Sequence, residues 1–271
     1  MKKVLILGGS GLIGKAIAEE MRGNEQLDVY GTYNSNLTVL DKNKSLKLNI
    51  EDLADTQHIL TAVQPEIVIS CIRGEFDKQL IFHRKVAEYL NENGGKLYFF
   101  STTNVFDGDT SKPHYEEDKP NSITDYGKFK IACEDMLMNI LHQNACILRI
   151  PQVWGKESPR MKQLIDAQRN KKKIKVYSGI FVNTNTDVCI AKKTCYIIDK
   201  DLKGIFHLSA DDMMDYKDIY NQLVLKLELK NVKFDEEISE GGYFAILSKR
   251  QQEFPNDFRI SNRLVIDYLT N

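Results

Sequence analysis

Short apolar runs alternate with longer amphipathic segments along most of this chain. Unbroken apolar runs are typical of strands buried on both faces of a parallel sheet, and apolar positions three or four apart are typical of helices. We expect strands at residues 4–7, 27–33, 46–50, 67–72, 96–100, 145–150 and 205–208. The helices expected between them lie at residues 15–21, 51–63, 76–93 and 126–143.

Strands that alternate with helices in this way are joined by right-handed crossovers. The pattern therefore predicts an α/β fold with a doubly wound, Rossmann-like parallel sheet of about seven strands. We expect this domain to hold residues 1–155 together with roughly 187–209. The remaining residues, roughly 156–186 and 210–271, are expected to form a smaller, mostly helical part.

A glycine-rich turn, with Gly8, Gly11 and Gly14, lies between the first strand and the first helix. Glycine permits a positive φ and a close backbone approach, and the helix N-terminus offers N–H groups to an anion. Directly after a buried strand, this turn predicts a dinucleotide site at the carboxyl ends of the strands. The cofactor-binding residues expected there are Gly8, Ser10, Gly11, Leu12, Ile13, Gly14, Tyr33, Asn34, Ser35, Asn49, Ile50, Ser70, Cys71, Ile72 and Ile150.

The end of the second strand bears on the choice of cofactor. In dinucleotide folds an acid at this point bonds the ribose 2′-OH of NAD and repels the 2′-phosphate of NADP. Here Tyr33 stands at that point, with no carboxylate beside it. We therefore favour NADP(H), and NAD(H) stays open because no arginine is present to bind the phosphate. Asn34, Ser35 or a lysine, Lys42 or Lys44, would have to bind it.

Candidate acid–base chemistry comes from Tyr126 and Lys130, which are four residues apart and so share one face of a helix. An ammonium near a phenol favours the ionised phenol. A free phenol with a pKa near 10 gives up its proton poorly at neutral pH, and a lysine together with a threonine hydroxyl can bring it into range. Thr102, directly after the fifth strand, can supply that hydroxyl.

With these residues the chain resembles the extended short-chain dehydrogenase/reductase family, and within it the dTDP-4-dehydrorhamnose reductase-like group. The resemblance covers most of the chain. It rests on Gly8-x-x-Gly11-x-x-Gly14, Ser101-Thr102-x-x-Val105-Phe106-x-Gly108, Tyr126-Gly127-Lys128-x-Lys130, and Leu148-Arg149 followed by Val153-Trp154-Gly155.

The resemblance implies roles for three catalytic residues. Tyr126 would protonate the substrate carbonyl oxygen, Thr102 would orient that carbonyl, and Lys130 would hold the nicotinamide ribose and lower the pKa of Tyr126. Tyr126 and Lys130 therefore also count as cofactor-binding residues. The smaller part would bind the substrate. The candidate substrate-binding residues are Thr103, Asn104, Val105 and Trp154, and a core position stays open for Trp154.

The function implied is NADPH-dependent reduction of a keto group on a nucleotide-activated sugar. Two alternatives stay open: a sugar-nucleotide epimerase of the same family, and a non-catalytic, cofactor-binding regulatory subunit. Dehydration is disfavoured, because Thr103 and Asn104 stand where the family's dehydratases carry two acids. Residues 71–76 and 178–185 depart from the family pattern, which leaves the sugar undetermined.

Composition limits the classes of partner that this protein is expected to bind. The net charge of −1 gives no field that favours nucleic acid or an anionic membrane, and the longest apolar runs are too short to span a bilayer. We expect a cytoplasmic protein with a nucleotide diphosphate sugar as partner, and a homodimer stays open. The five cysteines have no C-x-x-C spacing and the histidines no ligand spacing, so reduced thiols and no metal are expected. The lysine run at residues 171–175 is expected to be a solvated helix end.

Overall fold

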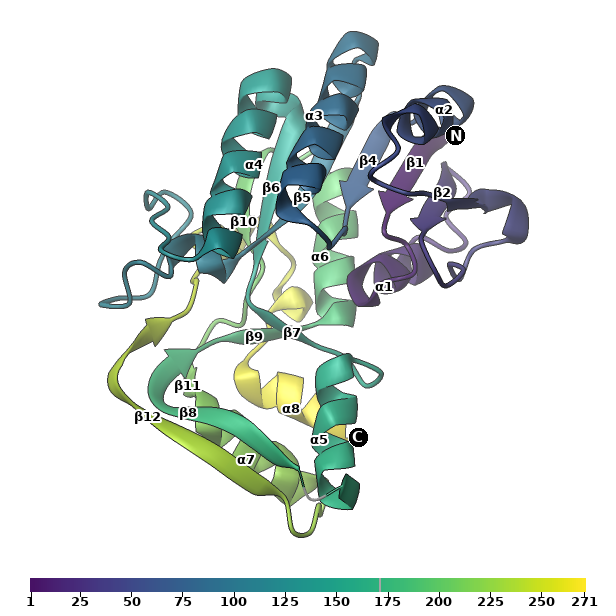
Figure 1. The fold of residues 1–271 in the computed structure, drawn as a ribbon. Helices are drawn as coiled ribbons and strands as arrows, with labels where there is room; N and C mark the ends of the chain where they lie inside the picture. The colour runs from purple at the N-terminus through teal and green to yellow at the C-terminus, as the bar shows by residue number, and fades with distance from the viewer. Residues whose placement is uncertain (171) are drawn as a thin grey trace.

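In the computed structural model, which describes residues 1–170 and 172–271, a seven-stranded sheet forms the larger part of the molecule (Figure 1). Its order is β10-β6-β5-β4-β1-β2-β3, and every neighbouring pair is parallel. The strands are β1 (Lys2–Leu7), β2 (Leu27–Tyr33), β3 (Ser45–Lys47), β4 (Ile67–Ser70), β5 (Lys96–Thr102), β6 (Ala145–Ile150) and β10 (Gly204–His207). The strand order reverses between β1 and β4, and ligands bind at such a reversal. The predicted α/β fold is confirmed.

Helices cover both faces of this sheet because successive side chains of a strand point to opposite sides. Val4 and Ile6 of β1 belong to the core under one layer of helices, whereas Leu5 and Leu7 belong to the core under the other. The first layer holds α1 (Leu12–Glu20) and α6 (Asp187–Asp199). The second holds α2 (Leu53–Val63), α3 (Phe76–Asn93) and α4 (Asp125–Leu141). Figure 1 shows α3 and α4 side by side on this second face.

The third strand differs from its prediction. We expected a strand over residues 46–50, but β3 ends at Lys47. The reason is local, since the Asn49 side chain accepts a hydrogen bond from the Glu51 N–H and turns the chain towards α2. The Asp52 carboxylate then caps α2 by accepting from the N–H groups of Ala54 and Asp55, each at 3.0 Å.

The smaller part contains the expected helices and also a sheet that we did not expect. The helices are α5 (Pro159–Asn170), α7 (Tyr216–Lys226) and α8 (Asn262–Thr270). Within the described residues, β11 (Met214–Asp215), β8 (Lys173–Val182) and β12 (Lys233–Phe244) form a three-stranded sheet, and β7 (Gln152–Trp154) pairs with β9 (Thr184–Thr186). The pattern of apolar residues did not predict this sheet, because β12 is an exposed edge strand with mostly polar residues.

Figure 1 shows the smaller part below the main sheet, with β8 and β12 running together along its outer edge. It has its own hydrophobic core, built mainly from α5, α7, α8 and β8. The division into the two parts remains a proposal, which this separate core supports. Short 3₁₀ helices lie at Lys42–Lys44, Thr103–Phe106, His142–Asn144, Gln251–Glu253 and Asn256–Phe258.

Within the described residues, no helix has the length and apolar character needed to cross a membrane. The lysine run at residues 171–175 begins at a position outside the described residues. Lys173 and Lys175 belong to β8, so this stretch is partly strand.

Candidate active site

The turn between β1 and α1 depends on glycine. Gly8 has a φ of +79°, and a Cβ on Gly14 would collide with the Gly8 carbonyl oxygen. The buried Thr32 of β2 fastens the turn, because its hydroxyl accepts a hydrogen bond of 3.0 Å from the Gly8 N–H. Thr32 was not predicted. Since α1 begins directly after Gly11, its first N–H groups lie in this cradle, which fits the pyrophosphate of a dinucleotide.

The predicted cofactor-binding residues lie around this cradle, at the carboxyl ends of the parallel strands. Gly8 and Cys71 are neighbours, because a Cβ on Gly8 would lie 3.1 Å from the Cys71 carbonyl oxygen. The sheet likewise brings together residues that end or follow β1, β2, β3, β4 and β6, which include Ser10, Leu12, Ile13, Tyr33, Asn34, Ser35, Asn49, Ile50, Ile72 and Ile150. Their role in cofactor binding remains a prediction.

One lysine proposed for the cofactor phosphate lies elsewhere. Lys44 forms an ion pair of 2.8 Å with Asp28, near the start of β2, whereas Tyr33 ends that strand. The structure therefore gives no support to a role of Lys44 at a phosphate beside Tyr33.

The Ser70 hydroxyl is hydrogen-bonded to a buried histidine that we did not predict. Ser70 is 2% exposed, and its Oγ lies 2.7 Å from Nε2 of His83 on α3. The other ring nitrogen, Nδ1, lies 2.7 Å from the Gln79 carbonyl oxygen. Burial, together with the nearby Lys130 charge, lowers the pKa of His83 to about 3. His83 is therefore neutral at physiological pH.

This histidine predicts an acid sensitivity. The pKa of an unfolded histidine is near 6.5, so between about pH 6.5 and 3 the unfolded chain binds a proton that folded His83 does not. The free energy of unfolding should fall as the pH falls through this window, by up to about 1.4 kcal/mol per pH unit for this group. In His83→Asn the slope between pH 6 and pH 5, measured by urea denaturation, should be shallower. An unchanged slope would contradict the assignment.

Thr102 and Tyr126 lie near each other at the carboxyl end of β5. Thr102 ends β5, and its hydroxyl donates a hydrogen bond of 3.0 Å to Oδ1 of Asn104. Tyr126, in the first turn of α4, is 38% exposed. The pKa of Tyr126 is raised, because burial of the phenol outweighs the lowering effects of the Arg73 positive charge and of the nearby Thr102 hydroxyl. The two hydroxyls are therefore neighbours near the carboxyl end of β5.

Lys130 lies deeper in the protein than Tyr126. Its side chain is buried, and Nζ donates a hydrogen bond of 2.8 Å to the Phe100 carbonyl oxygen and lies 4.3 Å from the centre of the Phe99 ring. Burial lowers the pKa of Lys130 to about 8. The pKa of Tyr126 is raised by burial, and the cation that partly offsets this rise is Arg73, in the turn after β4. The expectation that Lys130 lowers this pKa is therefore not met in this structure.

The segment before α4 places Tyr126 against the end of β5. The Thr124 hydroxyl caps the helix by accepting from the Gly127 N–H, and the Asp107 carboxylate accepts from the Ser122 hydroxyl at 2.7 Å. Gly127 touches the backbone of Asn104 so closely that a Cβ there would collide with its carbonyl oxygen. This contact explains the glycine directly after Tyr126.

A buried ionic network continues the same face of α4. Glu134 lies four residues after Lys130 and forms an ion pair of 2.7 Å with Arg149 of β6. The Ser101 hydroxyl, one residue before Thr102, also donates to Glu134. The i, i+4 spacing from Lys130 was the sequence signal that could have pointed to Glu134.

Several candidate substrate residues are buried in the protein interior. Val105 and Trp154 are 0% exposed and Thr103 is 3% exposed. The Trp154 ring packs against Tyr220, with centroids 5.6 Å apart, in the core of the smaller part. Neither Val105 nor Trp154 presents side-chain surface in this structure, so their assignment to substrate binding remains a prediction that the burial does not support. Asn104 remains a candidate with a half-exposed side chain.

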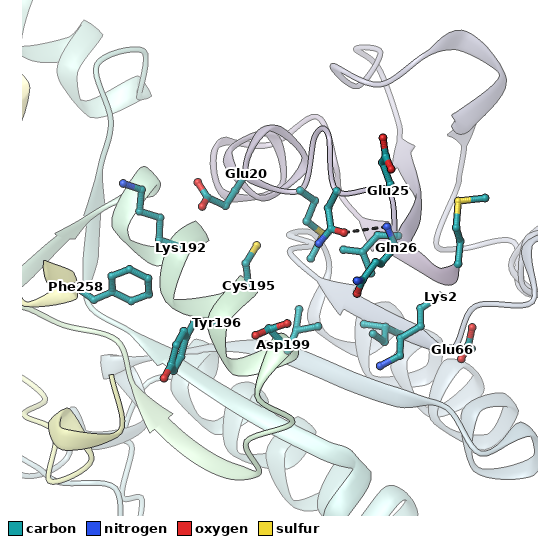
Figure 2. A pocket seen from close by; sticks show the side chains of 16 residues that line it. Lys2, Glu20, Glu25, Gln26, Glu66, Lys192, Cys195, Tyr196, Asp199 and Phe258 are labelled. Carbon is teal, nitrogen blue, oxygen red and sulfur yellow. Dashed lines mark hydrogen bonds between the residues drawn. The ribbon is translucent and has the colours of Figure 1, made fainter. Parts of the chain in front are cut away.

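A cavity of about 850 Å³ lies at the other end of the sheet (Figure 2). It is lined by the start of β1, the end of α1 and one side of α6, with Lys2, Glu20, Tyr196 and Asp199 among its residues. The glycine turn and the Thr102–Tyr126 pair lie at the opposite, carboxyl end of the strands. This cavity is therefore separate from the candidate active site.

The family of the chain follows from its match to a family model. The RmlD substrate binding domain model matches residues 76–238, more than half of the chain. The chain belongs to this family. The resemblance to the dTDP-4-dehydrorhamnose reductase-like group of extended short-chain dehydrogenase/reductases is thereby confirmed.

Relatives of this family differ in what they do. Methionine adenosyltransferase 2 subunit beta of Bos taurus is 26% identical over 235 residues, which cover 79% of this chain and 68% of that protein. A dTDP-4-dehydrorhamnose reductase of Bacillus anthracis, solved with NADP, is 20% identical, with a TM-score of 0.79 and coverage of 99% and 98% of the two chains. The Bordetella bronchiseptica enzyme WbmH, solved with NAD⁺, is 19% identical, with a TM-score of 0.80 and coverage of 99% and 98%. The two structural likenesses establish a shared fold.

Proposed function

We propose that this protein reduces a keto group on a nucleotide-activated sugar with NADPH. The observation that carries the proposal is that Tyr126 lies near the Thr102 hydroxyl, at the same end of the parallel strands as the glycine turn. A bound nicotinamide cofactor would supply the hydride. Tyr126 would donate its proton to the carbonyl oxygen, and the Thr102 hydroxyl would turn from Asn104 to donate a hydrogen bond to the same oxygen.

The substrate class is supported by the size of the smaller part and by its relatives. The core of this part is built from residues that a dinucleotide domain does not need. A nucleotide diphosphate sugar could use such a surface, and contacts to its non-reacting portion would add binding energy to the reaction. The Bacillus anthracis neighbour is named as a reductase of such a sugar.

The test is a panel of nucleotide-linked ketosugars with NADPH, followed by absorbance at 340 nm. Net NADPH oxidation that depends on the ketosugar, with little turnover of cyclohexanone, would support the proposal. Equal turnover of both would remove the argument for a nucleotide sugar. Interconversion of sugar epimers without net NADPH oxidation would favour the epimerase alternative.

A regulatory subunit without catalysis is the second candidate. It is favoured by the 26% identity to methionine adenosyltransferase 2 subunit beta and by the Lys130 ammonium, which faces the Phe100 carbonyl. Its test is the activity of a methionine adenosyltransferase with and without this chain added. Cofactor binding with no turnover across the sugar panel, together with a change in the activity of the methionine adenosyltransferase, would favour the regulatory subunit over the reductase.

The preference for NADPH gives a prediction at Tyr33. Tyr33→Asp would place a carboxylate beside the 2′-phosphate of NADPH, and the repulsion should weaken NADPH binding by about 1–3 kcal/mol. NADH has no phosphate there and should bind as before. Titration calorimetry with both cofactors measures the two affinities. Equal binding of NADPH and NADH by the wild type would contradict the preference itself.

A further inference from the structure

Lys47 lies beside Tyr33 at the carboxyl end of the sheet. It is the last residue of β3, and the parallel register with β2 pairs it directly with Tyr33. The N–H of Leu48 also donates a hydrogen bond of 2.9 Å to the Tyr33 carbonyl oxygen, which holds the two strand ends together. Paired residues of neighbouring strands point to the same face of a sheet. The lysine side chain therefore leaves the sheet next to the Tyr33 ring.

The acids that follow Lys47 in the chain are already engaged. Glu51 is paired with Lys78 at 2.7 Å, and the Asp55 carboxylate accepts a hydrogen bond of 3.3 Å from the Asn49 N–H. The Asp52 carboxylate caps α2. Within the described residues, the exposed Lys47 forms no ion pair, so its ammonium is available to an anion from outside.

Lys42, the other lysine expected to serve a phosphate, sits differently. It lies in the 3₁₀ helix Lys42–Lys44, before Ser45, which is in register with Gly31. The parallel strands then run two residues further, to Tyr33 and Lys47. Lys47 is thus the lysine at the strand end where a dinucleotide places its adenosine ribose.

We propose that Lys47 selects NADPH over NADH by binding the 2′-phosphate of the adenosine ribose beside Tyr33. The inference rests on the proposed function, which needs a nicotinamide cofactor in the glycine turn. An ammonium binds a phosphate dianion as a point charge, and the 2′-hydroxyl of NADH offers it no charge. The lysine thus takes the place of the arginine that this strand end lacks.

The experiment is titration calorimetry of NADPH and NADH with the full chain and four variants. Lys47→Gln should weaken NADPH binding about tenfold and leave NADH binding within twofold, because one charge-assisted contact is lost. Lys47→Glu should weaken NADPH binding further. Lys230→Gln, an exposed lysine between α7 and β12, controls for the loss of any one positive charge. Raising the salt concentration should narrow the NADPH advantage of the wild type more than that of Lys47→Gln.

Other results would overturn the inference in distinguishable ways. A tenfold loss of NADPH binding in Lys42→Gln, with none in Lys47→Gln, would assign the phosphate to the other lysine. An equal loss of NADPH and NADH binding in Lys47→Gln would mean a structural role at the end of β3. Failure of the wild type to bind either cofactor would overturn the proposed function as well, whereas tight NADPH binding unaffected by Lys47→Gln would overturn only the role of Lys47.

Discussion

Tyr126→Phe is expected to lower the rate of ketosugar-dependent turnover by a factor of about 10²–10⁴. The variant should bind NADPH as the wild type does. The substitution removes only the hydroxyl that would donate the proton. The ring should keep its place, because it packs against Phe76 with centroids 5.8 Å apart. Steady-state kinetics should place the loss in kcat, since an interaction made only in the transition state is removed.

Control variants distinguish a catalytic role of the Tyr126 hydroxyl from a packing role of its ring. Tyr89→Phe, on α3 and away from the site, should leave kcat unchanged. Lys130→Met should behave differently from Tyr126→Phe and lower both cofactor binding and turnover, since Lys130 is expected to hold the nicotinamide ribose. A Tyr126→Phe protein with full turnover would falsify the catalytic assignment. Loss of NADPH binding in that variant would point instead to a structural role for the phenol.

The parts of the site that sequence predicted are those encoded within one segment. The spacing of Gly8, Gly11 and Gly14 implies a tight turn by itself, and four residues of helix suffice to put Tyr126 and Lys130 on one face. The sheet order then brings these segments to one edge. Local pattern and fold class together thus predicted that these segments lie at one edge of the sheet, where the candidate site is.

The parts that sequence missed depend on contacts between distant segments. Thr32 fastens the Gly8 turn from another strand, and His83 reaches Ser70 from α3. The burial of Trp154 follows from the core of the smaller part, which no local pattern encodes. Lys47 could be placed beside Tyr33 only once the register of β3 was known. Each of these needs the three-dimensional neighbour, which composition and periodicity do not supply.

Arg149→Met is expected to destabilise the folded protein by about 3–5 kcal/mol, because it leaves the Glu134 carboxylate buried without its partner. The two side chains are 1% and 3% exposed and form an ion pair of 2.7 Å. The guanidinium also lies over the Phe106 ring, 5.0 Å from its centre, so packing is lost with the charge. Urea denaturation at pH 7 measures the change.

An exposed ion pair serves as the control for the buried pair of Arg149 and Glu134. Lys175→Met breaks an ion pair with Glu237 in which both side chains are more than half exposed, so the free energy of unfolding should hardly change. The double variant Glu134→Gln/Arg149→Met should recover part of the stability lost in Arg149→Met, since no buried charge is left unpaired. If Arg149→Met lowered the free energy of unfolding no more than Lys175→Met does, the buried pair would not hold α4 against β6. Because Ser101 shares this carboxylate and precedes Thr102, loss of the pair should also disturb the alignment of Thr102 with Tyr126.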